Sequence, residues 1–149
     1  MNAEGREQVK KLREELKEMK FDAVFSSPLK RARETAEILV DDLQKIIFDQ
    51  RLEERDVGKY QGELLSSMDR EEYWHYPSTV HYEMVETIES FFQRVYQFLD
   101  ELKKKPYDRI LVVAHSGVSK AFQTYFEGME EGYFLKRGLQ NCEWKEYQL

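Results

Sequence analysis

The stretch RILVVAHSG, residues 109–117, decides the fold of this chain. Residues 109–114 form a nearly continuous aliphatic run, as expected for a strand that is buried on both faces of a parallel sheet. The run ends at His115 and two small residues, and residues 118–126 have the apolar spacing of a helix. A strand that leads directly into a helix is the repeating unit of α/β domains, so this stretch predicts a layered α/β fold.

A second strand and helix are predicted near the start of the chain. Residues 21–25 have the pattern of a short strand, Ser27 is suited to cap a helix, and Pro28 is suited to its first position. We expect that helix to end near Leu39. The other predicted elements are helices over residues 5–20 and 88–102, a strand over 46–48, a glycine-punctuated loop up to residue 62, and a last strand over 142–149. Residues 66–85 have no assignable period, and no linker divides the chain, so we expect one domain over residues 1–149.

Composition narrows the class of protein. A chain of 149 residues with 41% hydrophobic residues can build one sizeable core. Its net charge of −6 argues against a general nucleic-acid or acidic-membrane surface, and no apolar run is long enough to span a membrane. Cys142 is the only cysteine, which excludes an intrachain disulfide and favours a reducing, cytoplasmic location.

The end of the first strand offers a phosphate cradle. Open α/β sheets bind ligands beyond the carboxyl ends of their strands. A helix beginning after Ser27 would present unpaired backbone N–H groups there, and Arg31, one turn further on, would add a cationic fork. The alternative is that Ser27 and Pro28 only cap a helix and that Arg31 is a solvated side chain.

The end of the second strand carries His115. An imidazole there could hold a phosphoryl group, shuttle a proton or act as nucleophile, and the small residues Ser116 and Gly117 would let backbone N–H groups approach an anion. Glu54, in the glycine-punctuated loop, could donate a proton to a leaving oxygen. The alternatives are a structural histidine and a carboxylate that faces solvent.

The remaining histidines and the cysteine give no ligand pattern. His75 and His81, flanked by Glu72 and Glu83, match no metal-binding spacing, so we expect no metal and an aromatic loop surface. Cys142 is expected to be a buried thiol of the last strand.

Taken together, these segments resemble the histidine phosphatase superfamily, also called phosphoglycerate-mutase-like, across essentially the whole chain. The resemblance rests on residues 2–8, on the SSPLKRA motif at 26–32, on 52–62, on 89–90 and on 113–115. It implies a three-layer α/β/α fold with a mainly parallel sheet, and hydrolysis or transfer of a phosphomonoester through phosphohistidine, without metal or cofactor. Arg31 and the Ser116 backbone would hold the phosphate of a small molecule, His115 would stabilise the transferring group, and Glu54 would protonate the leaving oxygen.

One family motif has no match here. Members open with a strand ending in Arg-His-Gly, whose histidine takes the phosphoryl group, and no such tripeptide occurs in this sequence. We therefore expect a chain truncated relative to the family, with the first central strand missing and activity abolished or strongly impaired. Neighbouring strands would re-pair, or two chains would associate as a homodimer through the exposed sheet edge. The alternatives are a non-catalytic module that binds a phosphate ligand or a protein, and a start assigned downstream of the true one.

Overall fold

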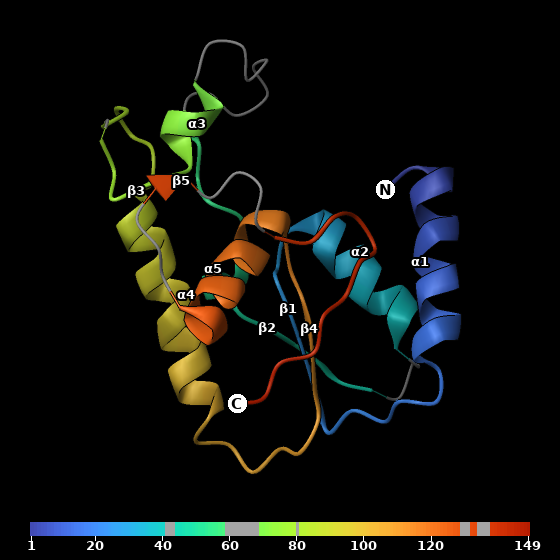
Figure 1. Ribbon diagram of the computed structural model, residues 1–149. Coiled ribbons are helices and arrows are strands. Elements are labelled where there is room, and N and C mark those ends of the chain that lie inside the picture. Colours follow the sequence, from blue (N-terminus) through green and yellow to red (C-terminus); the bar gives the residue numbers. More distant parts are fainter. Residues whose placement is uncertain (41–43, 59–68, 80, 129–131, 134–137) are drawn as a thin grey trace.

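The computed structural model describes residues 1–40, 44–58, 69–79, 81–128, 132–133 and 138–149 (Figure 1). The elements in chain order are α1 (Ala3–Leu16), β1 (Ala23–Ser26), α2 (Lys30–Leu39), β2 (Ile46–Phe48), the 3-10 helix η1 (Gln50–Leu52), α3 (Arg70–Tyr73), β3 (His75–Tyr76), α4 (Ile88–Leu102), β4 (Ile110–Val113), α5 (Ser116–Glu127) and β5 (Gly132–Tyr133). The predicted α/β class, with a small parallel sheet, is confirmed.

The main sheet has the strand order β2-β1-β4, and both pairings are parallel. Phe25 in the middle strand is in register with Ile47 on one side and Val112 on the other. Helices α1 and α2 lie on one face of the sheet, and α4 and α5 lie on the other (Figure 1). The short strands β3 and β5 pair antiparallel in a separate small sheet.

Each face of the sheet has its own core. The larger core joins Ala23 and Phe25 of β1 to the apolar stripe of α4, in which Phe91, Val95 and Phe98 are almost fully buried. Phe25 meets Phe98 edge to face with ring centroids 5.4 Å apart. The smaller core packs Ala32 and Ala36 of α2 against Val113 of β4; alanines at these positions bring that helix close to the strand. The helical periodicity read from residues 88–102 therefore marks the main core.

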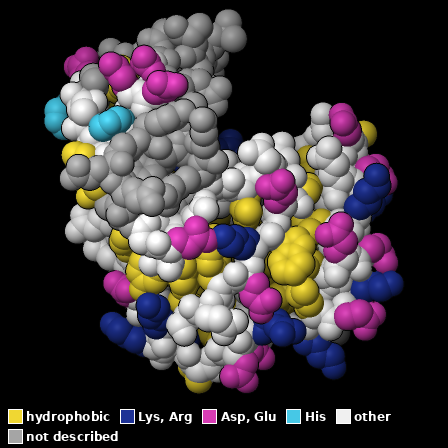
Figure 2. Space-filling view, viewed as in Figure 1, with side chains coloured by type: hydrophobic (Ala, Val, Ile, Leu, Met, Phe, Trp, Pro, Cys, Tyr) yellow, Lys and Arg dark blue, Asp and Glu magenta, His cyan; other side chains and the backbone are white. Residues whose placement is uncertain are grey.

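Strand β4 is less buried than its aliphatic sequence predicts. Of its four residues only Val113 is buried, and Ile110, Leu111 and Val112 are half-buried. The strand is covered on both faces, as predicted: Ile110 and Val112 pack against the larger core, and Leu111 and Val113 belong to the smaller one. Its burial is incomplete because β4 pairs with β1 along one edge and no described residue pairs with its other edge. On the face seen in Figure 2, hydrophobic side chains show between acidic and basic ones.

The C-terminal segment is not a strand. Residues 142–149, predicted as the last strand, form a turn followed by irregular chain that packs along α5. Tyr147 stacks on Phe126 with centroids 4.5 Å apart, whereas Trp144 is 45% exposed. A strand needs a neighbour to satisfy its backbone groups, and the described residues offer this segment none. Cys142 lies in the turn with a φ of 59°, half-buried, so the prediction of a buried strand thiol was also wrong.

Two smaller differences concern helix starts and the unassigned region. Helix α2 begins at Lys30 with Leu29 as its N-cap, so Pro28 precedes the helix instead of opening it, and the Ser27 hydroxyl accepts a hydrogen bond from the Leu29 N–H at 3.3 Å. Tyr73 and Trp74, from the stretch without a period, are buried against the main core. Part of the loop expected up to residue 62 lies outside the described residues.

Candidate functional site

The carboxyl ends of β1 and β4 meet at one edge of the sheet. Because the two strands are parallel and Ser26 is in register with Val113, the residues that follow them are also adjacent. The Ser27 N–H donates to the Val113 carbonyl at 3.0 Å, continuing the ladder beyond the strand. The pairing therefore brings His115 close to Ser27 and to the first turn of α2.

His115 lies between Arg31 and Ser27. Its Nδ1 accepts a hydrogen bond from Arg31 Nε at 3.0 Å, and its Nε2 lies 2.8 Å from Ser27 Oγ. Because Nδ1 is an acceptor, the neutral ring carries its proton on Nε2 and donates it to the serine. Burial, reinforced by the Arg31 and Arg94 cations, lowers the pKa of His115 from 6.5 to about 4. The imidazole is therefore neutral near pH 7, with its only N–H directed at a hydroxyl that is itself fully buried.

The backbone of His115 begins α5. It is the N-cap of that helix, with extended backbone, and its carbonyl accepts from the Ser119 N–H at 2.9 Å. The next residue, Ser116, is exposed on the first turn, where backbone N–H groups and the positive end of the helix dipole face outward. Arg31 is exposed on the first turn of α2. A helix start, an arginine and a neutral histidine thus share one end of the sheet.

Glu54 reaches the same helix start from the loop after η1. Its Oε2 accepts from the Gly117 N–H at 3.1 Å, and its Oε1 accepts from the N–H of Arg55 at 3.0 Å. A Cβ on Gly117 would lie 2.0 Å from Glu54 Oε1 and 2.6 Å from Trp74 Cη2, so this approach requires glycine. The carboxylate therefore stabilises the first turn of α5 as an anion at its positive end.

Two buried cations lie beneath this turn. Arg55 and Lys120 are each only 5% exposed, and both lie near the ring of Trp74, at 5.7 and 5.4 Å from its centroid. Arg55 also lies 3.8 Å from the Tyr73 ring and donates to the Tyr73 carbonyl. Burial lowers the pKa of Arg55. Glu54 and Glu86 are among the carboxylates whose charges act on Arg55 in this buried position.

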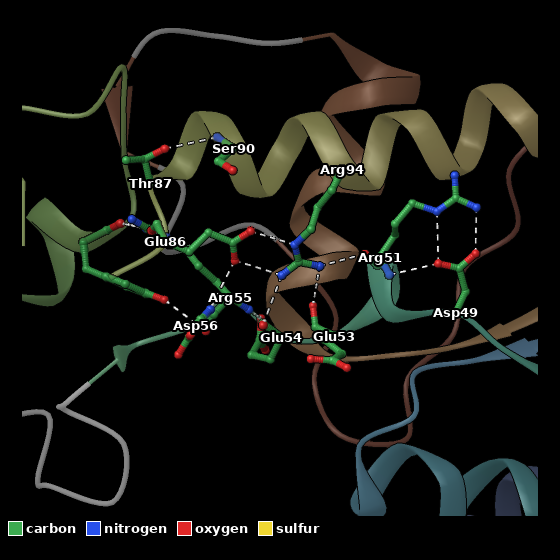
Figure 3. Close-up of polar contacts among 11 residues, drawn as sticks. Asp49, Arg51, Glu53, Glu54, Arg55, Asp56, Glu86, Thr87, Ser90 and Arg94 are labelled. Carbon is green, nitrogen blue, oxygen red and sulfur yellow. Dashed lines mark hydrogen bonds and ion pairs between the residues drawn. The ribbon is translucent and has the colours of Figure 1, made fainter. Parts of the chain in front are cut away.

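The sequence did not single out Arg94, Glu86 or Trp74. Arg94 occupies a polar position of the amphipathic helix α4, where a solvated side chain is the ordinary expectation. In the structure its guanidinium meets the loop that carries Glu54 (Figure 3). No pattern in the sequence signals this contact, because it joins residues 40 positions apart through a loop of irregular conformation.

The other histidines lie away from His115. His75 is in β3 with its Nδ1 2.9 Å from the Pro77 carbonyl, and His81 is exposed in the following loop. Over the described part of the chain, no group of three or more His, Cys, Asp or Glu side chains could hold a metal ion. None of the described helices has the length and apolar content needed to cross a membrane.

Comparison with known proteins identifies the family. The family model of the histidine phosphatase superfamily (branch 1) matches residues 1–149. The chain belongs to this superfamily. Among superfamily relatives, the uncharacterized phosphatase PhoE of Bacillus subtilis is 30% identical over an alignment of 152 positions, which covers 98% of this chain and 76% of PhoE. Phosphoserine phosphatase 1 of Hydrogenobacter thermophilus is 29% identical over 95% of this chain and 71% of its own length. A further relative from that organism is 32% identical over 129 residues, and this chain spans 64% of its length.

Solved structures of superfamily proteins share the fold. The alpha-ribazole phosphatase from Shigella flexneri is 28% identical, with a TM-score of 0.73 over 87% of this chain and 68% of that structure. The phosphoserine phosphatase from Entamoeba histolytica, solved in complex with 3-phosphoglyceric acid, is 21% identical, with a TM-score of 0.79 over 95% of this chain and 74% of that structure. The resemblance drawn from the motifs is therefore confirmed at the level of family and fold.

Proposed function

We propose that Arg31, Glu54, His115 and Ser116 form the phosphate-handling part of a histidine phosphatase active site. The observation that carries the proposal is the 3.0 Å contact between Arg31 and His115, which come from the ends of two different strands. A guanidinium beside a neutral imidazole at a helix start offers an anion both positive charge and hydrogen-bond donors. Membership of a phosphatase family, and a relative in complex with 3-phosphoglyceric acid, support a small phosphomonoester as the ligand.

The proposed roles follow from these positions. Arg31 and the Ser116 N–H hold the phosphate, and His115 stabilises the transferring phosphoryl group. In the family reaction a nucleophilic histidine, which these four residues do not supply, forms a bond to phosphorus as the bond between phosphorus and the ester oxygen breaks. That oxygen takes its proton from Glu54, which must be in its protonated carboxyl form for this step. In this proposal Glu54 must exchange its contact with the Gly117 N–H for one with the leaving oxygen. The reaction uses side chains and backbone alone, with no metal or cofactor.

No histidine of this chain matches the nucleophilic histidine of the family, which limits the reactions that these residues can catalyse alone. Its three histidines are His75, His81 and His115, and none follows an arginine. The imidazole of His115 bonds to Arg31 and Ser27, and neither His75 nor His81 reaches it. We propose that the 149 residues by themselves bind phosphate esters and turn them over poorly or not at all. The same observation favours the second candidate function, a non-catalytic module that binds a phosphate ligand or a protein.

Self-association is proposed at the free edge of β4. No described residue pairs with the second edge of β4, and a parallel strand with an open edge and half-buried aliphatic side chains is a template for a second strand. We propose that two copies of the chain form a homodimer through this edge. We also propose that each copy is a single domain and that the protein is located in the cytoplasm. Light scattering across a dilution series tests the association, and a mass equal to one chain at every concentration would refute it.

Phosphate binding tests the site directly. We expect Arg31→Ala to weaken binding of inorganic phosphate and phenyl phosphate by about 10- to 100-fold, the loss of one hydrogen bond to a charged group. Arg33→Ala is the matched control, because Arg33 lies on the same helix but pairs with Glu37 and covers the Phe48 ring. Titration calorimetry measures both. Equal binding by the two variants, or no phosphate binding by the unmodified chain, would overturn the proposed site.

Turnover separates the two candidate functions. If the unmodified chain hydrolyses p-nitrophenyl phosphate and His115→Ala does not, the chain is an enzyme and the proposed impairment is refuted. Phosphate binding without hydrolysis above the His115→Ala background would favour the binding module.

A further inference from the structure

Arg94 uses all of its hydrogen-bonding capacity around one loop. Its Nε and Nη2 donate to the two carboxylate oxygens of Glu86 at 2.7 and 2.9 Å (Figure 3). Its Nη1 donates to the carbonyl oxygens of Arg51 and Glu53 at 2.8 and 2.9 Å, and Nη2 also donates to the carbonyl of Glu54 at 3.2 Å. A guanidinium has five N–H donors in one plane, so every donor of Arg94 has an acceptor.

Glu86 ties the same loop from the other side. Its carboxylate accepts from the N–H of Asp56 at 3.2 Å, and its own N–H donates to the Asp56 carbonyl at 3.1 Å. Its carbonyl accepts from Arg55 Nε at 2.8 Å. The Glu86 and Arg94 side chains are only 15% and 22% exposed, so their ion pair is more than a surface contact. Residues 51–56 are therefore held along their backbone by one ion pair.

The held loop ends in the carboxylate of Glu54. Arg94 fixes the carbonyl of Glu54, and the side chain of the same residue crosses to the Gly117 N–H at the start of α5. A displacement of the order of 1 Å in that backbone would break a hydrogen bond already 3.1 Å long. The loop has no regular secondary structure from Glu53 to Val57, so its position depends on such side-chain contacts.

We infer that Arg94 is a positioning residue, which sets the place of the Glu54 carboxylate through the backbone of residues 51–54 and is itself oriented by Glu86. The inference rests on the proposed role of Glu54 in the site. A lysine at position 94 would keep the charge and the pairing with Glu86, but its three donors on one nitrogen cannot span acceptors on three residues of the loop. The role therefore requires the planar fork of arginine.

The test measures where Glu54 lies without needing activity or a ligand. The amide proton of Gly117 donates to the Glu54 carboxylate, so its chemical shift in a ¹⁵N correlation spectrum reports that contact. Glu54→Gln lacks the negative charge, so the Gly117 amide shift in that variant is the reference value for loss of the charge-assisted hydrogen bond. The matched control is Arg51→Gln, because the Arg51 side chain pairs with Asp49 and Glu101, whereas the Arg51 carbonyl that Arg94 holds is kept by the substitution.

We expect Arg94→Lys to move the Gly117 amide shift at least halfway to its Glu54→Gln position, with Arg51→Gln at the wild-type position. If Arg94→Lys does not fold, Glu86→Gln supplies the test, since it weakens the orientation of Arg94 and should move the same signal in the same direction. If the Gly117 signal does not move in the variant that folds, the inference is overturned. That result would mean that the ion pair of Arg94 with Glu86 stabilises the fold without setting the position of the Glu54 carboxylate. The result does not depend on phosphate binding, so the positioning role and the proposed function can fail separately.

Discussion

Gly117→Ala is expected to destabilise the protein, although alanine normally favours a helix over glycine. The new Cβ would lie 2.0 Å from Glu54 Oε1 and 2.6 Å from Trp74 Cη2, so the carboxylate must leave the first turn of α5. The substitution gains up to about 1 kcal/mol of helix propensity. It loses a charge-assisted hydrogen bond of about 1.5–3 kcal/mol and a helix-dipole interaction of about 0.3–1 kcal/mol. The balance is a loss of about 1–3 kcal/mol in the free energy of unfolding.

Urea unfolding followed by circular dichroism measures this loss. Gly5→Ala is the matched control, because Gly5 also lies in the first turn of a helix but the nearest atom to its new Cβ would be Cγ of the flexible Met1 side chain, at 2.8 Å. We expect the control to keep or raise the stability by up to about 1 kcal/mol. Removing Glu54 first should lower the cost of Gly117→Ala, since one of the two obstacles is then gone. If Gly117→Ala were as stable as the wild type, Glu54 would not lie against α5 in solution, and the reasoning would be refuted.

Three further predictions concern stability. Because the pKa of His115 is lowered from 6.5 to about 4, the unfolded chain binds a proton that the folded chain does not, so the stabilisation present above pH 6.5 is lost as the pH falls to 4. Allowing for solvent screening, we expect the free energy of unfolding to change by about 1–2 kcal/mol less between pH 6.5 and pH 4 in His115→Gln than in the wild type. Urea unfolding at the two pH values measures this, and an equal change in both proteins would contradict it. Arg55→Met should lower the free energy of unfolding by about 2–4 kcal/mol, because the buried Tyr73 carbonyl and the part-buried Glu86 carbonyl lose the Arg55 donors. An unchanged melting temperature in calorimetry would rule this out. Phe98→Ala should lower the free energy of unfolding by about 3–5 kcal/mol, because Phe98 is buried in the main core. Phe48 is 43% exposed, so Phe48→Ala should lower it far less. Similar denaturant midpoints for the two variants would count against the assigned core.

Local pattern was enough to predict most of the elements. The stripe over residues 88–102 became α4, and the aliphatic run followed by a small turn became β4 and α5. These predictions held because the period of apolar residues reflects the face that an element buries. The errors occurred where a neighbour decides the outcome. Residues 142–149 have strand-like composition but no described partner. Strand β4 packs on both faces, as its sequence predicts, but it is only half-buried because no described residue pairs with its second edge.

The candidate residues were named from the sequence, but their relations were not. Arg31 and His115 stand at two predicted strand ends, and the parallel pairing of β1 with β4 brings them within 3.0 Å. Glu54 was named by resemblance, and its contact with the Gly117 N–H appeared only in the structure. Their roles in phosphate chemistry remain predictions.

The sequence by itself determined the α/β class, the main helix stripe and the residue types available for phosphate chemistry. These depend on backbone preference and apolar period, which are properties of short segments. Only the tertiary structure decided that Arg94 holds the loop of Glu54, that Gly117 must be a glycine, and that, among the described residues, β4 pairs along one edge only. Each of these depends on atoms from segments far apart in the chain, and hydrogen bonds and steric contacts act over a few ångströms in space whatever the separation in sequence.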